Sequence, residues 1–162
     1  MPSYLVTGGS GQLGQCFHAV AKESPAINLF FTSRNEVDIT RSETLANFYS
    51  KNPFDGIINC AAYTNVDQAE KEEESAFKIN TEGLRNLIDF AEEKKLSIIH
   101  FSTDYVFDGN SSEPYPEEAA TNPIGIYGNS KLKGEVHLSK SSCKNVTIRI
   151  SWLFSPFGKN FV

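Results

Sequence analysis

Residues 4–14 read Tyr4-Leu5-Val6-Thr7-Gly8-Gly9-Ser10-Gly11-Gln12-Leu13-Gly14. A short apolar run leads directly into a glycine-rich turn, and apolar residues then recur at helical spacing as far as Ala21. A strand, a glycine turn and a helix in this order favour dinucleotide binding, because glycines let the backbone turn tightly and approach a pyrophosphate at the helix N-terminus. The glycine spacing departs from G-x-G-x-x-G, and no Gly-Lys-Ser/Thr follows, which disfavours a P-loop.

The rest of the chain alternates between apolar runs and helical periodicity. Strands are predicted at 28–32, 56–61, 97–102 and 146–150, and helices at 42–49, 67–91 and 127–139. This alternation predicts an α/β domain with a doubly wound parallel sheet, a Rossmann-type NAD(P)-binding architecture spanning residues 1–162. Ligands of such sheets bind at the carboxyl ends of the strands.

Composition excludes several classes of protein. With 20 acidic and 15 basic residues the net charge is -5, which disfavours binding to nucleic acid or to anionic membranes. The cysteines, Cys16, Cys60 and Cys143, are too few and too scattered for a disulfide framework, and no metal-ligand spacing is present. No apolar run approaches the ~20 residues of a membrane span, and the early strand leaves no room for a signal peptide. We therefore expect a cytoplasmic protein without a metal site.

The end of the second predicted strand bears on the choice of cofactor. An acidic residue there would bind the adenosine ribose 2′-hydroxyl, whereas an arginine accommodates a 2′-phosphate. The sequence here is Thr32-Ser33-Arg34, which favours NADPH over NADH, the alternative being that Arg34 is an ordinary exposed loop residue. Asp38 and Ile39 follow closely and are candidates to face the adenine.

A second constellation, Tyr127-Gly128-Asn129-Ser130-Lys131, places a tyrosine and a lysine on one face of a predicted helix. Tyrosine titrates at about 10 in water, so a tyrosine that exchanges protons at neutral pH needs a nearby cation, and Lys131 is one turn away. Thr103, in Ser102-Thr103-Asp104 at the end of a predicted strand, is a candidate to donate a hydrogen bond to a substrate carbonyl. The alternative is that Thr103 and Asp104 only cap the turn after the strand.

Three weaker signals have two interpretations each. Ala61 and Ala62 follow the third strand and either admit a cofactor or simply pack. Asn80 lies in a predicted helix interior, where asparagine is unfavourable, so it has either a polar role or a surface position. Trp152 follows the last strand and is either a core residue or a platform for a ring, and we favour the platform.

Four segments together resemble the dTDP-4-dehydrorhamnose reductase family of extended short-chain dehydrogenases/reductases. They are the glycine turn, residues 59–70 (NCAAYTNVDQAE), residues 102–109 (STDYVFDG) and residues 127–135 (YGNSKLKGE). Residues 149–152 and 157–161 also resemble the family, so the likeness runs nearly end to end. The STDYVFDG stretch is its most specific part.

The resemblance implies reduction of the 4-keto group of dTDP-4-dehydro-L-rhamnose to dTDP-L-rhamnose, with hydride from NADPH or NADH. It implies that Tyr127 donates the proton, that Lys131 lowers the pKa of Tyr127 and holds the nicotinamide ribose, and that Thr103 polarises the ketone. Asp104 and Trp152 would contact the sugar. The residues expected around the cofactor, besides Tyr127 and Lys131, are Gly8, Gly11, Gln12, Leu13, Gly14, Ser33, Arg34, Asp38, Ile39, Ala61, Ala62 and Tyr63.

Members of this family continue into a smaller C-terminal domain that completes the sugar-nucleotide pocket. We expect that domain to be missing here, and this chain alone to have weak or no activity. Two other classes remain open: a noncatalytic regulatory subunit similar to the methionine adenosyltransferase beta subunit, and a sugar-nucleotide epimerase or dehydratase. A homodimer also remains open.

Overall fold

The computed structural model describes residues 1–23 and 26–158. Its strands are β1 (Ser3–Thr7), β2 (Asn28–Phe31), β3 (Gly56–Asn59), β4 (Ser97–Thr103) and β5 (Asn145–Ile150). They form one sheet in the order β2-β1-β3-β4-β5, and every neighbouring pair is parallel. The predicted doubly wound α/β fold is therefore confirmed.

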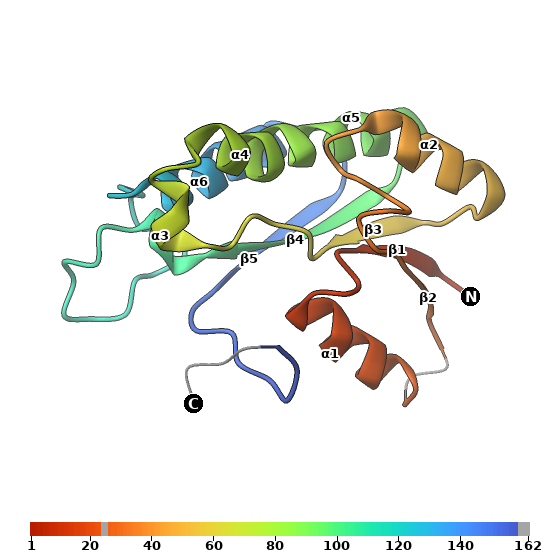
Figure 1. Ribbon diagram of the computed structural model, residues 1–162, viewed down its shortest axis with the longest axis horizontal. Helices are drawn as coiled ribbons and strands as arrows, with labels where there is room; N and C mark the ends of the chain where they lie inside the picture. The colour runs from red at the N-terminus through yellow and green to blue at the C-terminus, as the bar shows by residue number, and fades with distance from the viewer. Residues whose placement is uncertain (24–25, 159–162) are drawn as a thin grey trace.

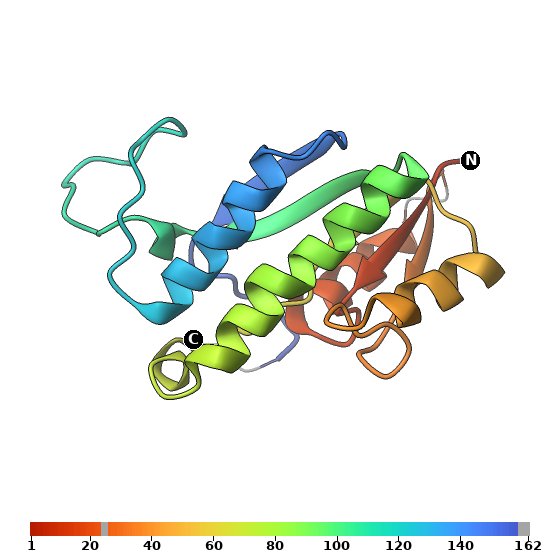
Figure 2. The same ribbon diagram turned by 90° about the horizontal axis from the view of Figure 1, so that it is seen from above.

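The helices cover the two faces of the sheet unequally (Figures 1 and 2). One face carries α2 (Ser42–Lys51), α5 (Leu84–Lys94) and α6 (Ile126–Ser139), whereas the other carries α1 (Gln12–Ala21). The main core lies under the first layer, where Leu5, Ile57 and Ile98 share one row of the sheet register and pack with apolar residues of α2 and α5. Because these three residues are in register, the carboxyl ends of β1, β3 and β4 lie at the same edge of the sheet.

The chain reverses its winding direction between β1 and β3. From β1 it passes through α1 to β2 on one side, and it then returns to β3 on the other side of β1. Connections that leave in opposite directions open a crevice at the carboxyl ends of those strands, where ligands of such sheets bind.

The single helix predicted at 67–91 is wrong. The segment forms α3 (Val66–Ala69), α4 (Glu73–Phe77), a π-helical segment η1 (Lys78–Gly83) and then α5. Asn65 caps α3 by accepting the Gln68 N–H, and the backbone departs from helical geometry at Glu72. Glu70, the C-cap of α3, accepts the Ile126 N–H at the start of α6 on its Oε1 at 2.8 Å. The break thus aligns α6, the helix that carries Tyr127 and Lys131. A short 3₁₀ turn, η2 (Asp104–Val106), follows β4.

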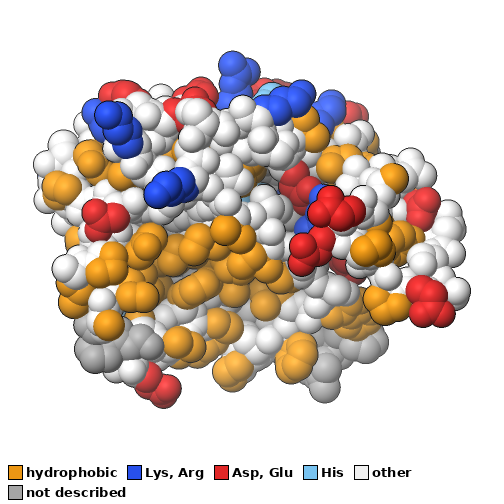
Figure 3. Space-filling view, turned by 180° about the vertical axis from the view of Figure 1, so that it is seen from behind, with side chains coloured by type: hydrophobic (Ala, Val, Ile, Leu, Met, Phe, Trp, Pro, Cys, Tyr) orange, Lys and Arg blue, Asp and Glu red, His pale blue; other side chains and the backbone are white. Residues whose placement is uncertain are grey.

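The face that carries α1 leaves apolar side chains exposed, and Figure 3 shows hydrophobic side chains gathered across the lower half of the molecule. The ring of Phe101 on β4 packs on Phe17 of α1 at 5.8 Å between centroids. Val146 and Ile148 of β5 pair with Ile99 and Phe101, so they share this face, and both are exposed. Within 1–23 and 26–158, no helix is long and apolar enough to cross a membrane. Residues 159–162, part of the last segment that resembles the family, lie outside the described residues.

Candidate active site at the carboxyl ends of the strands

The glycine turn brings bare backbone against neighbouring backbone. Gly8 has φ +63, and a Cβ there would lie 2.8 Å from the backbone of Ala61. A Cβ on Gly14 would lie 2.5 Å from the Gly8 carbonyl oxygen, so α1 packs directly on the turn. Gly11 is the N-cap of α1, with no side-chain cap and no acidic residue in the first turn. This helix N-terminus therefore offers its positive dipole to an anion.

A cavity of about 460 Å³ lies beside this helix end, and we call it the carboxyl-end cavity. It is lined by residues that sequence reasoning singled out from five separate segments: Gly11, Gln12, Leu13, Ala61, Ala62, Thr103, Asp104, Tyr127, Lys131 and Trp152. The fold thus brings the glycine turn and the Tyr-Lys pair to the same cavity. A cavity of this size with few convergent polar groups is typical of small-molecule sites.

Tyr127 and Thr103, the two candidate hydroxyl groups for catalysis, both line this cavity. Burial raises the pKa of Tyr127, a hydrogen bond with the Thr103 side chain lowers it, and Asp104 and Tyr105 raise it further, with a net rise. Thr103 Oγ1 also donates to Asp104 Oδ1 at 3.1 Å and accepts the Tyr105 N–H at 3.2 Å. Thr103 therefore caps η2, as the alternative interpretation predicted, and still lies beside the tyrosine hydroxyl.

Lys131 is buried, with 2% of its surface exposed. Its Nζ donates to the Phe101 carbonyl at 2.7 Å and lies 3.4 Å from Nε2 of His100. Burial lowers the pKa of Lys131 to about 8, and Glu135 opposes that shift. The lowering of the Tyr127 pKa by Lys131 stays a prediction for the ligand-bound site.

Several polar groups of this site escaped sequence reasoning. Ser102 Oγ is buried without a hydrogen-bond partner among the described residues, and it lines the carboxyl-end cavity. A buried hydroxyl without a partner costs about 1–3 kcal/mol, so a ligand that bonded to it would be favoured. Asn59, at the end of the third predicted strand and in the segment 59–70 that resembles the family, also lines the cavity, and His100 is buried beside Lys131. No sequence pattern marks His100, because its contacts depend on the register between strands.

Asn80 has the polar role that its helical position suggested. Its Oδ1 accepts the Tyr63 N–H at 2.9 Å, and its Nδ2 donates to the Tyr63 carbonyl and to Ser130 Oγ. Asn80 therefore clamps the segment after β3 to α6 and does not lie on the surface.

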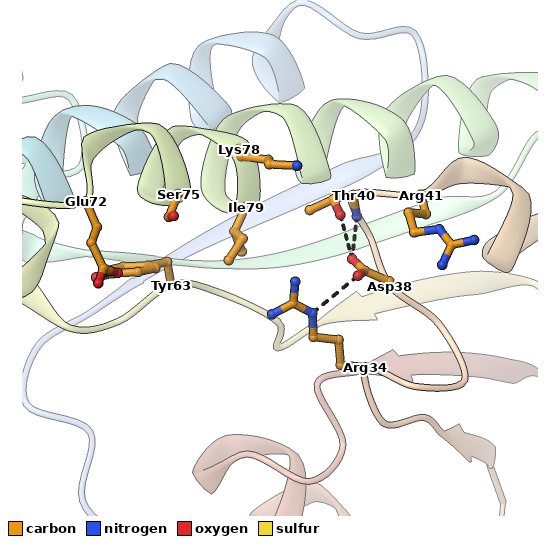
Figure 4. Close-up of a pocket in the computed structure, with 9 residues that line it drawn as sticks. All are labelled: Arg34, Asp38, Thr40, Arg41, Tyr63, Glu72, Ser75, Lys78 and Ile79. Atoms are coloured by element: carbon orange, nitrogen blue, oxygen red, sulfur yellow. Dashed lines mark hydrogen bonds and ion pairs between the residues drawn. The ribbon is translucent and has the colours of Figure 1, made fainter.

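A second cavity, of about 490 Å³, lies beyond the end of β2 (Figure 4), and we call it the β2-side cavity. Its lining comprises Arg34, Asp38, Thr40, Arg41, Tyr63, Glu72, Ser75, Lys78 and Ile79. Figure 4 shows three cationic side chains around it, from the segment after β2, the start of α2 and η1. Arg34 Nε pairs with Asp38 Oδ2 at 3.2 Å. The two cavities lie on either side of the segment 61–63: Ala61 and Ala62 line the carboxyl-end cavity, and Tyr63 lines the β2-side cavity.

Four of the residues expected at the cofactor line neither cavity: Gly8 and Gly14 of the glycine turn, Ser33 and Ile39. Ser33 donates its N–H and its hydroxyl to Glu36 Oε2 at 2.9 and 2.8 Å. The side chain of Ile39 is 5% exposed and belongs to the main core. Trp152 is 70% exposed with φ 54, so the interpretation of Trp152 as a core residue is wrong, and the platform stays a prediction. Across the described ranges, no group of three His, Cys, Asp or Glu could hold a metal ion.

Comparisons with known proteins agree with this geometry. The RmlD substrate binding domain family model matches residues 3–162. A dTDP-4-dehydrorhamnose reductase of Aggregatibacter actinomycetemcomitans is 38% identical over all of this chain and 55% of its own length, and one from Sinorhizobium fredii is 39% identical over 97% and 52%. A structure of dTDP-4-dehydrorhamnose reductase from Bacillus anthracis in complex with NADP superposes with a TM-score of 0.93 at 36% identity, covering 99% of this chain and 57% of that one. The chain therefore belongs to the RmlD substrate binding domain family, and it spans about half the length of the relatives that it matches.

Proposed function

We propose that this chain carries the cofactor site and the proton-transfer groups of an NAD(P)H-dependent reductase acting on the 4-keto group of dTDP-4-dehydro-L-rhamnose. The observation that carries the proposal is the meeting of Tyr127, Lys131 and Thr103 with the N-terminus of α1 in one cavity. Family membership supports the substrate class. The two relatives compared above carry the name of this activity.

The protein groups supply the proton side of the reduction. When bound, the nicotinamide supplies the hydride. Tyr127 and Thr103 line the same cavity, and we place the ketone oxygen between their hydroxyls. Burial raises the pKa of Tyr127 and keeps its hydroxyl protonated at neutral pH, so Tyr127 holds the proton that the developing alkoxide takes up, and a cation at Lys131 would assist the transfer by stabilising the phenolate. Asp104 and the exposed face of Trp152 lie beside this point and are assigned to the sugar.

The two neighbouring cavities are suited to the two ends of a nicotinamide dinucleotide, one cavity to each end. We place the nicotinamide ribose beside Lys131 in the carboxyl-end cavity, the pyrophosphate at the N-terminus of α1, and the adenosine in the β2-side cavity. In that cavity Arg34, Arg41 and Lys78 would surround a 2′-phosphate, which favours NADPH. The relative from Bacillus anthracis, solved with NADP, supports this choice.

Calorimetric titration of the 162-residue chain with NADPH and NADH tests the cofactor site. We expect tighter binding of NADPH. Gly11→Asp should abolish binding of both cofactors, because an aspartate caps a helix well but repels a pyrophosphate. Arg34→Ala should weaken NADPH binding about tenfold and leave NADH nearly unchanged, since one partly exposed charged contact contributes about 1–1.5 kcal/mol.

Arg85→Ala on α5 is the matched control, because Arg85 is exposed and pairs only weakly with Asp89 at 3.9 Å. If circular dichroism shows that the chain is folded and neither NADPH nor NADH gives a binding heat, the cofactor assignment is contradicted.

Turnover tests the substrate assignment. With dTDP-4-keto sugar and NADPH we expect this chain to show weak or no net oxidation of NADPH. Catalysis requires tight positioning of the substrate, and relatives are about twice as long as this chain and would use their C-terminal half to complete the sugar-nucleotide pocket. Any residual rate should disappear in Tyr127→Phe. A rate equal to that of a full-length relative would contradict the expectation of an incomplete pocket. Product formed without net NADPH consumption would indicate an epimerase or dehydratase, and a stable complex with a partner enzyme in the absence of any reduction would favour a regulatory subunit.

A further inference from the structure

A row of buried polar side chains crosses the sheet directly beneath the candidate site. Register places Thr7 of β1 beside Asn59 of β3, and Asn59 beside His100 of β4. Asn59 is 2% exposed and His100 is 1% exposed, so water does not serve as their partner. Each hydrogen bond in the row must therefore match a donor with an acceptor.

The direction of the row is fixed at its backbone end. The Ala61 N–H can only donate, and it points at one end of the Asn59 amide at 3.2 Å, where Thr7 Oγ1 also lies at 2.7 Å. That end must be the oxygen Oδ1, so the amide nitrogen Nδ2 lies at the other end and donates. Its acceptor is Nδ1 of His100, at 3.1 Å. A neutral imidazole that accepts at Nδ1 carries its proton on Nε2.

The proton on Nε2 of His100 determines what the lysine can be. Nε2 lies 3.4 Å from Lys131 Nζ, which also donates to the Phe101 carbonyl at 2.7 Å. An ammonium has three donors and no acceptor, so it would oppose the Nε2–H with another N–H. A neutral amine donates one N–H to the Phe101 carbonyl and accepts the Nε2–H of His100 with its lone pair, so that no two donors face each other.

We propose that His100 is a positioning residue: held by Asn59 in its Nε2–H form, it shifts the proton equilibrium of Lys131 toward the neutral amine in the cofactor-free protein. Building on the proposed function, a bound ligand that offers new acceptors would shift this equilibrium back toward the ammonium, so the titration of Lys131 would depend on occupancy of the site. Burial of Lys131 acts in the same direction.

Other titratable groups near Lys131 modify this balance. Glu135 lies one turn along α6, is paired with Arg149 at 2.7 Å, and favours the ammonium. Tyr127 on the same helix and Cys60 after β3 line the cavity, and burial raises the pKa of both, so both are uncharged at neutral pH. His100 is thus the group whose hydrogen-bond direction opposes Glu135.

Nitrogen NMR of histidine-labelled chain tests the direction of the row. The protein has three histidines, so loss of one set of ring signals in His100→Gln assigns them. We expect the His100 ring to remain neutral with its proton on Nε2 between about pH 6 and pH 9. A proton on Nδ1, or a charged ring in that range, would overturn the proposal.

The titration of Lys131, followed by carbon NMR of the lysine Cε and assigned with Lys131→Arg, tests the effect on the lysine. In His100→Leu the donor to the neutral amine is lost, so the midpoint should rise by about one unit. His100→Gln can accept from Asn59 and donate to Lys131, so it should retain the wild-type midpoint. His137→Gln is the control for a distant histidine.

An unchanged or lowered midpoint in His100→Leu would overturn the proposal. Should that variant fail to fold, the wild-type tautomer and the His100→Gln midpoint still decide. Neither measurement uses turnover, so failure of this proposal and failure of the proposed function are distinguishable.

Discussion

At the scale of single residues, the buried Lys131 makes stability depend on pH in an unusual direction. Burial lowers its pKa from 10.5 to about 8, so between these values the unfolded chain binds a proton that the folded chain does not. The free energy of unfolding therefore rises with pH across this window, by roughly 3 kcal/mol for this group alone. Below about pH 8 the full penalty of the buried charge is present.

Urea unfolding at several alkaline pH values measures this contribution. The wild-type free energy of unfolding, after subtraction of the Lys131→Met curve, should rise from about pH 8 upward. Lys131→Met keeps the length of the buried stem without the charge, so it isolates the lysine. Parallel curves for the two proteins would contradict a lowered pKa of Lys131.

Sequence reasoning located the site residues whose positions follow from strand ends. Thr103 and Tyr127 meet because parallel strands end at one edge and the next helix starts there. Ser33 and Ile39 were expected at the cofactor from their position after the second strand. Instead, the Ser33 hydroxyl donates to Glu36, and Ile39 packs in the main core. Sequence analysis gave no role to His100, because only the pairing of β3 with β4 places it between Asn59 and Lys131.

At the scale of elements, the contact between α1 and the glycine turn is tight enough to be tested by one methyl group. Gly14→Ala raises helix propensity by about 1 kcal/mol, yet its Cβ would meet the Gly8 carbonyl oxygen at 2.5 Å and Gly9 Cα at 2.6 Å. These neighbouring atoms belong to the backbone of Gly8 and Gly9, which cannot move aside for the new methyl group as the end of a flexible side chain could. We therefore expect a net destabilisation of about 2–4 kcal/mol, because α1 must shift away from β1.

Thermal unfolding compares this variant with Val20→Ala, which lies on the same helix at an exposed position. Val20→Ala should leave the melting temperature unchanged or slightly raised, because alanine is the better helix former. A Gly14→Ala protein as stable as the wild type would contradict the close approach of α1 to the turn.

The error at 67–91 shows what helical periodicity cannot predict. Apolar residues keep their spacing through this segment, but the helix breaks because Glu70 bonds to the start of α6, a residue 56 positions away. The π-helical segment η1 then turns Asn80 and Thr81 toward Ser130 on α6. Both features depend on tertiary contacts, whereas the strands, each defined by a local apolar run, were predicted to within a few residues.

At the scale of the whole molecule, unequal coverage of the sheet predicts self-association. Among residues 1–23 and 26–158, β5 pairs only with β4, and it presents exposed Val146 and Ile148 on the face of α1. Apolar edge strands promote association between chains. We expect the 162-residue chain to bind a hydrophobic dye and to sediment above its monomer mass at high concentration.

The double variant Val146→Thr and Ile148→Thr should reduce both signals without loss of strand content, because threonine retains a β-branched shape. Val136→Thr on α6, exposed outside β5, is the control. A strictly monomeric wild-type chain with no dye binding would contradict the prediction.

The segment after β5 crosses the mouth of the carboxyl-end cavity from one side of the sheet to the other. Ser151 Oγ donates to Asp104 Oδ2 at 2.7 Å, and the Leu153 carbonyl accepts from Gln12 Nε2 at 3.3 Å. Trp152, the single tryptophan of the chain, lies between these two attachments. Any ligand that competes for Asp104 or Gln12 therefore changes the surroundings of this one indole, and the protein contains its own unlabelled fluorescent reporter of site occupancy.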